Sequence, residues 1–164
     1  YSLGVEKISI SSQAILNPTL ITDAANLFGS QSVVVTLDVK KDFWGNKKVF
    51  IKNGKKNTKL NPAELINQIQ CLGAGEVVIN SVDNDGMMNG YDTDLFTQLK
   101  LKINIPIIAL GGAGNLDHIR EVFKISKVDA VGCGSMFVYQ GPLKGVLISY
   151  PSYNKIRKLL ANEI

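Results

Sequence analysis

The sequence has few of the residues that build metal and redox centres. Its 164 residues include one histidine, His118, and two cysteines, Cys71 and Cys133. The cysteines follow no metal-binding or redox spacing, which favours reduced thiols of an intracellular protein. His118 falls inside a predicted helix beside Asp117 and Arg120, so we interpret it as a surface residue and not as a catalytic base. We therefore expect neither a bound metal nor a cofactor.

Long apolar runs, targeting signals and one-sided charge are also missing. No apolar stretch approaches the ~20 residues that a membrane-spanning helix needs. Residues 1–10 lack the charged start and long apolar core of a signal peptide. The net charge is +4, and its lysines are scattered or gathered around residues 40–59 without an arginine–aromatic stripe. We interpret them as solvated surface, with phosphate attraction as the alternative, and expect a cytoplasmic protein without nucleic-acid or membrane partners.

What is present fits one ordinary globular domain. A chain of 164 residues with 45% hydrophobic and 20% charged residues can bury a substantial core. No linker or low-complexity stretch divides it. We therefore predict a single domain over residues 1–164.

Five predicted strands alternate with helices along this chain. The strands cover residues 7–11, 33–39, 76–81, 106–110 and 129–133. Alternation of this kind predicts a parallel α/β sheet, either open and doubly wound or part of a (β/α)8 barrel. No GxGxxG motif follows the first strand, so a dinucleotide-binding fold has little support.

Helix boundaries follow from capping residues. Asn-Pro pairs at residues 17–18 and 61–62 predict two helix starts, and Gly29 predicts the end of the first helix. Four further helices are predicted. They cover residues 92–102, residues 115–126 with Asn115 as cap, a short stretch capped by Ser135, and residues 152–162. In the first of these, Leu101 is predicted to face inward. The segment 40–60 interrupts the alternation, and Asn53-Gly54 predicts a hairpin within it that could cover the site. Trp44, in the same segment, is interpreted as a lid aromatic or as a hairpin anchor.

Carboxylates mark the ends of two predicted strands. Asp38 follows residues 33–37, and Asp85 lies in a polar stretch after residues 76–79. Ligands of parallel α/β proteins bind at the carboxyl ends of strands, where two carboxylates can divide acid and base roles. A lone Asp at a strand end can also be a helix cap or turn residue. Asp83 and Asp85 could hold Mg²⁺, although their spacing is weak support for a metal site.

Glycine-rich ends follow the last two predicted strands. Gly111 and Gly112 precede one helix, and Gly134 and Ser135 precede the next. Backbone N–H groups at a helix start bind phosphate without a cationic side chain. The alternative is that these glycines only form tight turns.

These stretches together resemble the HisF family, the cyclase subunits of imidazole glycerol phosphate synthase. The resemblance covers the whole chain and rests on residues 7–10 (KISI), 28–31 (FGSQ), 37–40 (LDVK), 73–76 (GAGE), 83–86 (DNDG), 90–92 (GYD) and 111–115 (GGAGN).

The resemblance implies a (β/α)8 TIM barrel of which this chain is the C-terminal portion, with strands 4 to 8. Members of the family receive ammonia from a HisH glutaminase through the barrel. They convert a bis-phosphorylated ribulosyl aminoimidazole carboxamide into imidazole glycerol phosphate and AICAR, in histidine biosynthesis. The chain would thus be a lyase or cyclase subunit of a glutamine amidotransferase complex. Because a partial barrel leaves sheet edges open, we expect further strands, from a longer chain or from another chain, to complete it.

The resemblance also implies roles for individual residues. Asp38 would be catalytic, Lys7 and Glu76 would belong to a charged gate at the ammonia entrance, and Glu6 would contact the glutaminase. Residues implied to bind substrate or its phosphates are Ser11, Asp85, Gly86, Gly111, Gly112, Gly134 and Ser135. A second catalytic Asp and a further phosphate loop of the family would precede residue 1, so this portion alone is expected to be inactive.

Several residues depart from the family pattern. Ser11, Asn80, Leu110 and Met87 stand where the family has Asn, Thr, Ser and Thr. The tail, residues 137–142 and 146–151, resembles the WbuZ-type paralogue of surface-polysaccharide clusters, associated with sugar amidation by a separate amidotransferase. Three hypotheses follow: a cyclase of the histidine type, a subunit that delivers ammonia for sugar amidation, and a non-catalytic scaffold that binds a glutaminase.

Overall fold

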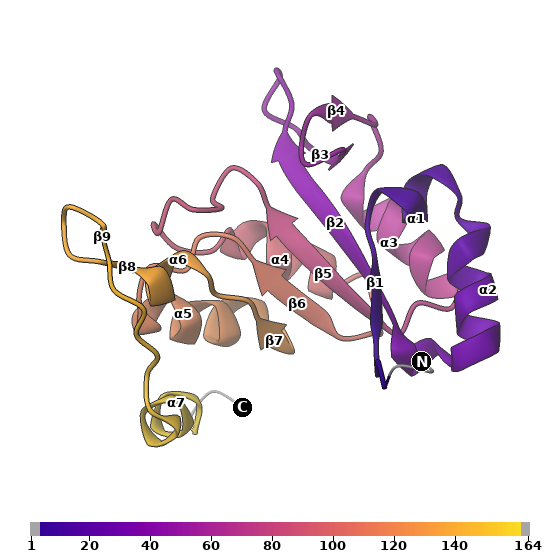
Figure 1. The fold of residues 1–164 in the computed structure, drawn as a ribbon. Coiled ribbons are helices and arrows are strands. Elements are labelled where there is room, and N and C mark those ends of the chain that lie inside the picture. Colours follow the sequence, from indigo (N-terminus) through magenta and orange to yellow (C-terminus); the bar gives the residue numbers. More distant parts are fainter. Residues whose placement is uncertain (1–3, 162–164) are drawn as a thin grey trace.

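The predicted strands form the centre of one twisted sheet (Figure 1). In this computed structural model, which describes residues 4–161, five parallel strands lie side by side. In spatial order they are β1 (Ile8–Ile10), β2 (Val33–Lys41), β5 (Glu76–Ser81), β6 (Ile107–Leu110) and β7 (Ala130–Val131). The predicted parallel α/β sheet is confirmed.

The predicted barrel is not closed in this structure. Within residues 4–161, β1 pairs only with β2 and β7 only with β6, so the parallel sheet has two open edges. Closure of a (β/α)8 barrel takes eight tilted parallel strands, and the described residues form five parallel strands.

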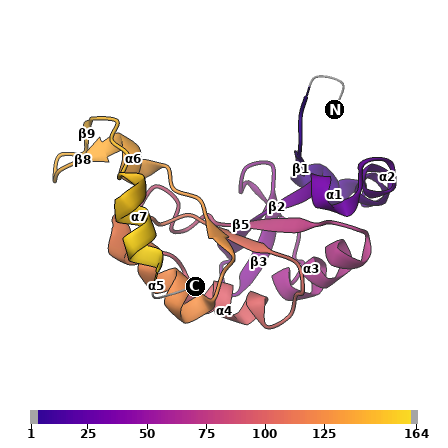
Figure 2. The same cartoon turned by 90° about the horizontal axis from the view of Figure 1, so that it is seen from below.

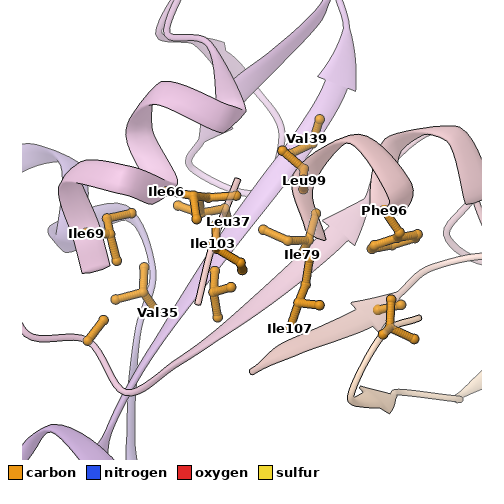
Figure 3. Packing of buried hydrophobic residues seen from close by; sticks show 14 of the residues in the cluster. Val35, Leu37, Val39, Ile66, Ile69, Ile79, Phe96, Leu99, Ile103 and Ile107 are labelled. Carbon is orange, nitrogen blue, oxygen red and sulfur yellow. The ribbon is translucent and has the colours of Figure 1, made fainter. Parts of the chain in front are cut away.

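Helices cover one face of this sheet (Figure 2). They are α2 (Thr19–Phe28), α3 (Pro62–Cys71), α4 (Thr93–Lys100) and α5 (Leu116–Ser126). The core lies between these helices and the strands, as Figure 3 shows for Leu37, Ile79 and Ile107 against Ile66 and Phe96. All five are fully buried, and burial of such a side chain contributes roughly 1.5–3 kcal/mol.

The opposite face of the sheet is open to solvent. Side chains alternate along β2 and β5, so Leu37 and Ile79 point toward the helices while Thr36, Asp38 and Asn80 point to the other side, where they are only half-buried. We call this second side of the sheet the open face. It presents polar groups from neighbouring strands to the same space.

Most predicted helix boundaries are confirmed. The side chain of Asn61 accepts a hydrogen bond from the N–H of Ala63 at the start of α3, and that of Asn115 accepts from His118 at the start of α5. Gly29 ends α2 with a φ of 85°, which only glycine adopts readily.

Three predicted boundary details are wrong. The side chain of Asn17 bonds to the Thr19 hydroxyl and caps no backbone N–H of α2, and a short helix, α1 (Ser12–Leu16), precedes it unpredicted. Ser135 is the first residue of α6 (Ser135–Val138), because Gly134 takes the capping position. Leu101 is the C-cap of α4 and is 80% exposed, because two residues after the buried Leu99 is about 200° further round the helix, on its outer face.

The segment 40–60 forms the predicted hairpin. β3 (Lys47–Ile51) pairs antiparallel with the end of β2 and with β4 (Lys56–Asn57). The turn between β3 and β4 contains Asn53 and Gly54, both with positive φ, as the sequence predicts. Trp44 lies in the preceding β2–β3 turn, 83% exposed, and its ring contacts that of Phe43 edge-on; neither interpretation of Trp44 is confirmed.

The C-terminal part lies beside the sheet. α6 is followed by a small hairpin of β8 (Tyr139–Gln140) and β9 (Gly145–Val146), and by α7 (Tyr153–Leu160), which packs against α5. A 3-10 turn, η1 (Ser30–Ser32), leads into β2. Across residues 4–161, the helices are all too short or too polar to cross a membrane.

Candidate functional site

Asp38 and Asn80 meet on the open face near the carboxyl ends of their strands. They are register partners on β2 and β5, and the Asn80 Nδ2 donates to the Asp38 Oδ1 at 3.1 Å. Both side chains are half-buried. Asp38 is therefore a strand residue with an oriented carboxylate, and the helix-cap and turn alternatives do not apply to it.

The glycine-rich end of β6 packs against the loop that follows β5. A Cβ atom on Gly112 would lie 2.0 Å from the carbonyl oxygen of Gly90, and one on Gly111 would lie 2.6 Å from that of Ser81. Gly90 donates its N–H to the carbonyl of Gly112 at 2.8 Å. Both Gly111 and Gly112 have positive φ, so close backbone packing and turn geometry already require glycine at these two positions.

Gly134 and Gly86 have a different environment. A Cβ atom on either one would meet no heavy atom within 4 Å, and Gly134 has an ordinary φ of −123°. Packing therefore does not explain Gly134. An open backbone at this place leaves room for a ligand to approach the main chain.

Six of the predicted site residues surround one small cavity of about 20 Å³. Its volume is close to that of a single water-sized group. A phosphoryl group would therefore seat an oxygen in the cavity and leave its other atoms outside. The cavity is lined by Asp85, Gly86, Leu110, Gly111, Gly112, Ala113, Gly132, Gly134 and Ser135.

A second depression, of about 560 Å³, is lined by other residues. They include Gly114 and Met136, which follow the two glycine-rich ends in the sequence, and part of the C-terminal segment. Polar groups of Asn115, Gln140 and Lys155 line it, beside the ring of Tyr150.

The loop 82–92 connects the ends of the strands through Tyr91, a residue for which the sequence pattern predicts no role. Tyr91 is 7% exposed; its hydroxyl donates to the Gly132 carbonyl at 3.0 Å and lies 3.2 Å from the Cys133 Sγ. Burial raises the pKa of the Tyr91 hydroxyl and that of the Cys133 thiol. Nothing in the one-dimensional pattern pairs these residues, since the contact joins the loop after β5 to the residues that follow β7, two strands away.

Two polar residues near the cavity have structural partners. Asp83 accepts from the N–H of Lys41 at 2.8 Å, so it fastens the loop to the end of β2. His118, which we predicted at the surface, is half-buried, and its Nδ1 accepts from the N–H of Gly114 at 3.2 Å. This hydrogen bond ties the imidazole ring to the glycine-rich end.

Of the described residues, no group of three or more His, Cys, Asp and Glu is placed to hold a metal ion.

The remaining predicted residues lie away from the cavity. Ser11 follows β1 at the carboxyl edge of the sheet and is exposed. Lys7 and Glu76 lie at the opposite, amino-terminal edge, where they form an ion pair on either side of β2. Glu6 is exposed beside this pair. The structure thus separates the predicted residues into a carboxyl-edge group and an amino-edge group.

Comparisons with known proteins give one consistent family. Residues 1–144 match the family described as "Histidine biosynthesis protein". The chain is 45% identical over 159 residues to a Vibrio vulnificus protein named "Putative imidazole glycerol phosphate synthase subunit hisF3", covering 96% of this chain and 61% of that protein. It is 44% identical over 141 residues to the "Imidazole glycerol phosphate synthase subunit HisF" of Clostridium botulinum, covering 84% of this chain and 54% of that protein. The chain thus spans a little over half the length of the curated relatives it matches.

Proposed function

The chain belongs to the histidine biosynthesis protein family, and from this premise we propose that it is the C-terminal portion of a HisF-type cyclase subunit. In this proposal its five parallel strands are strands 4 to 8 of a (β/α)8 barrel, and the open face is turned toward the barrel interior. The subunit uses ammonia from a HisH-like glutaminase on a phosphorylated substrate.

One observation carries the chemical part of the proposal. Asp38 and the small cavity lie at the same edge of the sheet, on neighbouring strands: Asp38 pairs with Asn80, and Asn80 pairs with Leu110, which lines the cavity. Adjacent strands are ≈ 4.8 Å apart, so Asp38 lies about 10 Å from the strand that carries the glycine-rich end. That separation lets one ligand place a phosphoryl group in the cavity and a reacting carbon beside the carboxylate.

The residues divide the work in the proposed reaction. The backbone around Gly111, Gly112, Gly134 and Ser135 holds the phosphoryl group, since N–H dipoles bind an anion without a charged side chain. Asp38 moves protons as the ring closes. Binding the phosphate at a distance from the carboxylate fixes the orientation of the reacting carbon.

The amino-edge group fits the delivery of ammonia. The ion pair between Lys7 and Glu76 lies at one end of the open face, and Asp38 lies toward the other end. We propose that ammonia enters between them and travels along this face to the carboxyl edge. Glu6, exposed beside the pair, is the proposed contact to the glutaminase.

The test is Asp38→Asn in the complete subunit of which this chain is the proposed C-terminal portion, assayed with ammonium chloride and the bis-phosphorylated ribulosyl aminoimidazole carboxamide. Turnover is expected to be lost while phosphate binding survives, because the glycine-rich ends are unchanged. Asp23→Asn is the matched control, since Asp23 is an exposed carboxylate on α2. Turnover of Asp38→Asn at the wild-type rate would remove Asp38 from the mechanism.

A second candidate function is ammonia delivery for amidation of a surface-polysaccharide sugar. It is favoured by the residues on the open face that depart from the HisF pattern, Asn80 and Leu110, which line the approach to Asp38. Under this function the protein co-purifies with an amidotransferase. It shows no cyclase turnover with ammonium chloride or with glutamine and the glutaminase.

A further inference from the structure

The amide oxygen of Asn80 is an exception in the hydrogen bonding of this protein. Among the described residues 4–161, it is the one buried side-chain oxygen or nitrogen for which the structure shows no hydrogen-bond partner. It lies against the next strand, where a Cβ on Gly111 would be 3.1 Å away. Buried polar groups in native proteins are nearly always paired, so each exception needs an explanation.

The orientation of the amide follows from its neighbour. An ionised carboxylate only accepts hydrogen bonds, so Asn80 must present its Nδ2 and not its Oδ1 to Asp38. The same orientation directs the oxygen toward β6, where it has no donor. The hydrogen bond to Asp38 and the unpaired oxygen therefore both result from the same orientation of the Asn80 amide.

A smaller residue at position 80 would leave no buried oxygen unpaired and would still fit the strand. Valine and threonine are β-branched and well suited to a sheet, and neither has a second polar atom to leave unpaired. An unpaired buried acceptor weakens the fold, and such losses concentrate where activity requires them. Asn80 leaves one oxygen unpaired, but unlike valine it gives Asp38 a fixed N–H donor.

We propose that Asn80 is a positioning residue, which holds the Asp38 carboxylate by one oxygen so that the other is the oxygen that exchanges protons with the ligand. This proposal rests on the proposed role of Asp38. The Nδ2–H bond fixes the plane of the carboxylate, and a misdirected general base or acid loses rate even when substrate binding is unchanged.

Asn80→Val and Asn80→Thr test this as a matched pair. The two residues have nearly the same shape, but only threonine keeps a donor, its hydroxyl, on the side of Asp38. In the ammonium-dependent assay, we expect kcat of Asn80→Val to fall between ~10-fold and ~100-fold with KM for the phosphorylated substrate unchanged. Asn80→Thr is expected to recover most of that loss. Both variants are expected to unfold at the wild-type temperature or above it, because the unpaired oxygen is gone.

The outcomes separate this inference from the proposed function. Wild-type turnover with an inactive Asp38→Asn, together with an Asn80→Val variant as fast as wild type, overturns the positioning role alone. A lower unfolding temperature for both variants assigns Asn80 to the fold and likewise overturns it. Absence of turnover in the complete wild-type subunit removes the proposed function, and the positioning role with it.

Discussion

The hydroxyl of Tyr91 donates to the carbonyl of Gly132 at 3.0 Å, and this bond joins the loop after β5 to the end of β7. Between them lies the glycine-rich end of β6, which the same loop holds through the bond from Gly90 to Gly112. Asn84 braces the loop by donating to the Gly90 carbonyl at 2.8 Å. Three strand ends are thus fixed by one loop, and the small cavity lies among them.

Removing the Tyr91 hydroxyl should weaken both the fold and the cavity. Tyr91→Phe keeps the buried ring and deletes one bond to a carbonyl, so the free energy of unfolding should fall by about 1 kcal/mol in urea titrations. Inorganic phosphate should also bind more weakly, measured by titration calorimetry, because the end of β7 is no longer held. Tyr153→Phe is the control, since Tyr153 is 77% exposed. Equal stability of Tyr91→Phe and wild type would contradict the structural role of this bond.

Stability should decline at alkaline pH because of Cys133 and Tyr91. Burial raises the pKa of both groups above their ordinary values of 9.0 and 10.0. Above pH 9 the unfolded chain therefore loses protons that the folded chain keeps, which favours unfolding. The stabilisation is complete below the ordinary pKa and is lost as the pH rises toward the folded one, at up to about 1.4 kcal/mol per pH unit for each group.

This pH effect is measured from urea unfolding between pH 7 and pH 11. Cys133→Ala should show a shallower alkaline decline than wild type, because one of the two groups is gone. Cys71→Ala should keep the wild-type slope, since Cys71 is exposed. A Cys133→Ala slope equal to that of wild type would show that the thiol does not contribute.

Two glycine substitutions should distinguish a glycine required for folding, Gly112, from a glycine proposed to bind phosphate, Gly134. Gly112→Ala places a Cβ 2.0 Å from a backbone oxygen at a φ of 109°, so it should destabilise the protein by several kcal/mol or prevent folding. Gly134→Ala meets no atom and needs no unusual φ, so its thermal unfolding should match wild type. If the β7 end binds phosphate through its backbone, Gly134→Ala should nevertheless weaken phosphate binding. Unchanged binding would exclude Gly134 from the site.

The Lys7–Glu76 ion pair should contribute little to stability. Its side chains are 48% and 21% exposed, and exposed pairs of this kind are worth ~0.2–1 kcal/mol. A double-mutant cycle of Lys7→Gln and Glu76→Gln should give a coupling free energy in that range. If the pair belongs to the ammonia entrance, the same variants should lose glutamine-dependent turnover and keep ammonium-dependent turnover. Equal loss of both activities would argue against the gate.

Local sequence patterns were sufficient for the five parallel strands and most of the helices, and they indicated the edge of the sheet at which the candidate site lies. The apolar runs ending in Asp38 and in residues 80–86 predicted strands with polar carboxyl ends, and both predictions are confirmed. Asn61 and Asn115 marked helix starts because capping is a local hydrogen bond. The prediction for Leu101 was wrong because a residue two positions after the buried Leu99 lies on the opposite face of the helix.

The contacts that give the site its geometry came only from the tertiary structure. The sequence by itself determined an α/β chain with a parallel sheet and a family resemblance, because hydrophobic periodicity, capping and motif spacing are local properties. It could not show that close backbone contacts require glycine at positions 111 and 112, while a Cβ at position 134 would meet no atom. Nor could it show that the Tyr91 hydroxyl donates a hydrogen bond to the Gly132 carbonyl. Nor could it show that Asn80 faces Asp38 with its oxygen unpaired. These relations join residues on different strands, so they exist only once the register and curvature of the sheet are fixed.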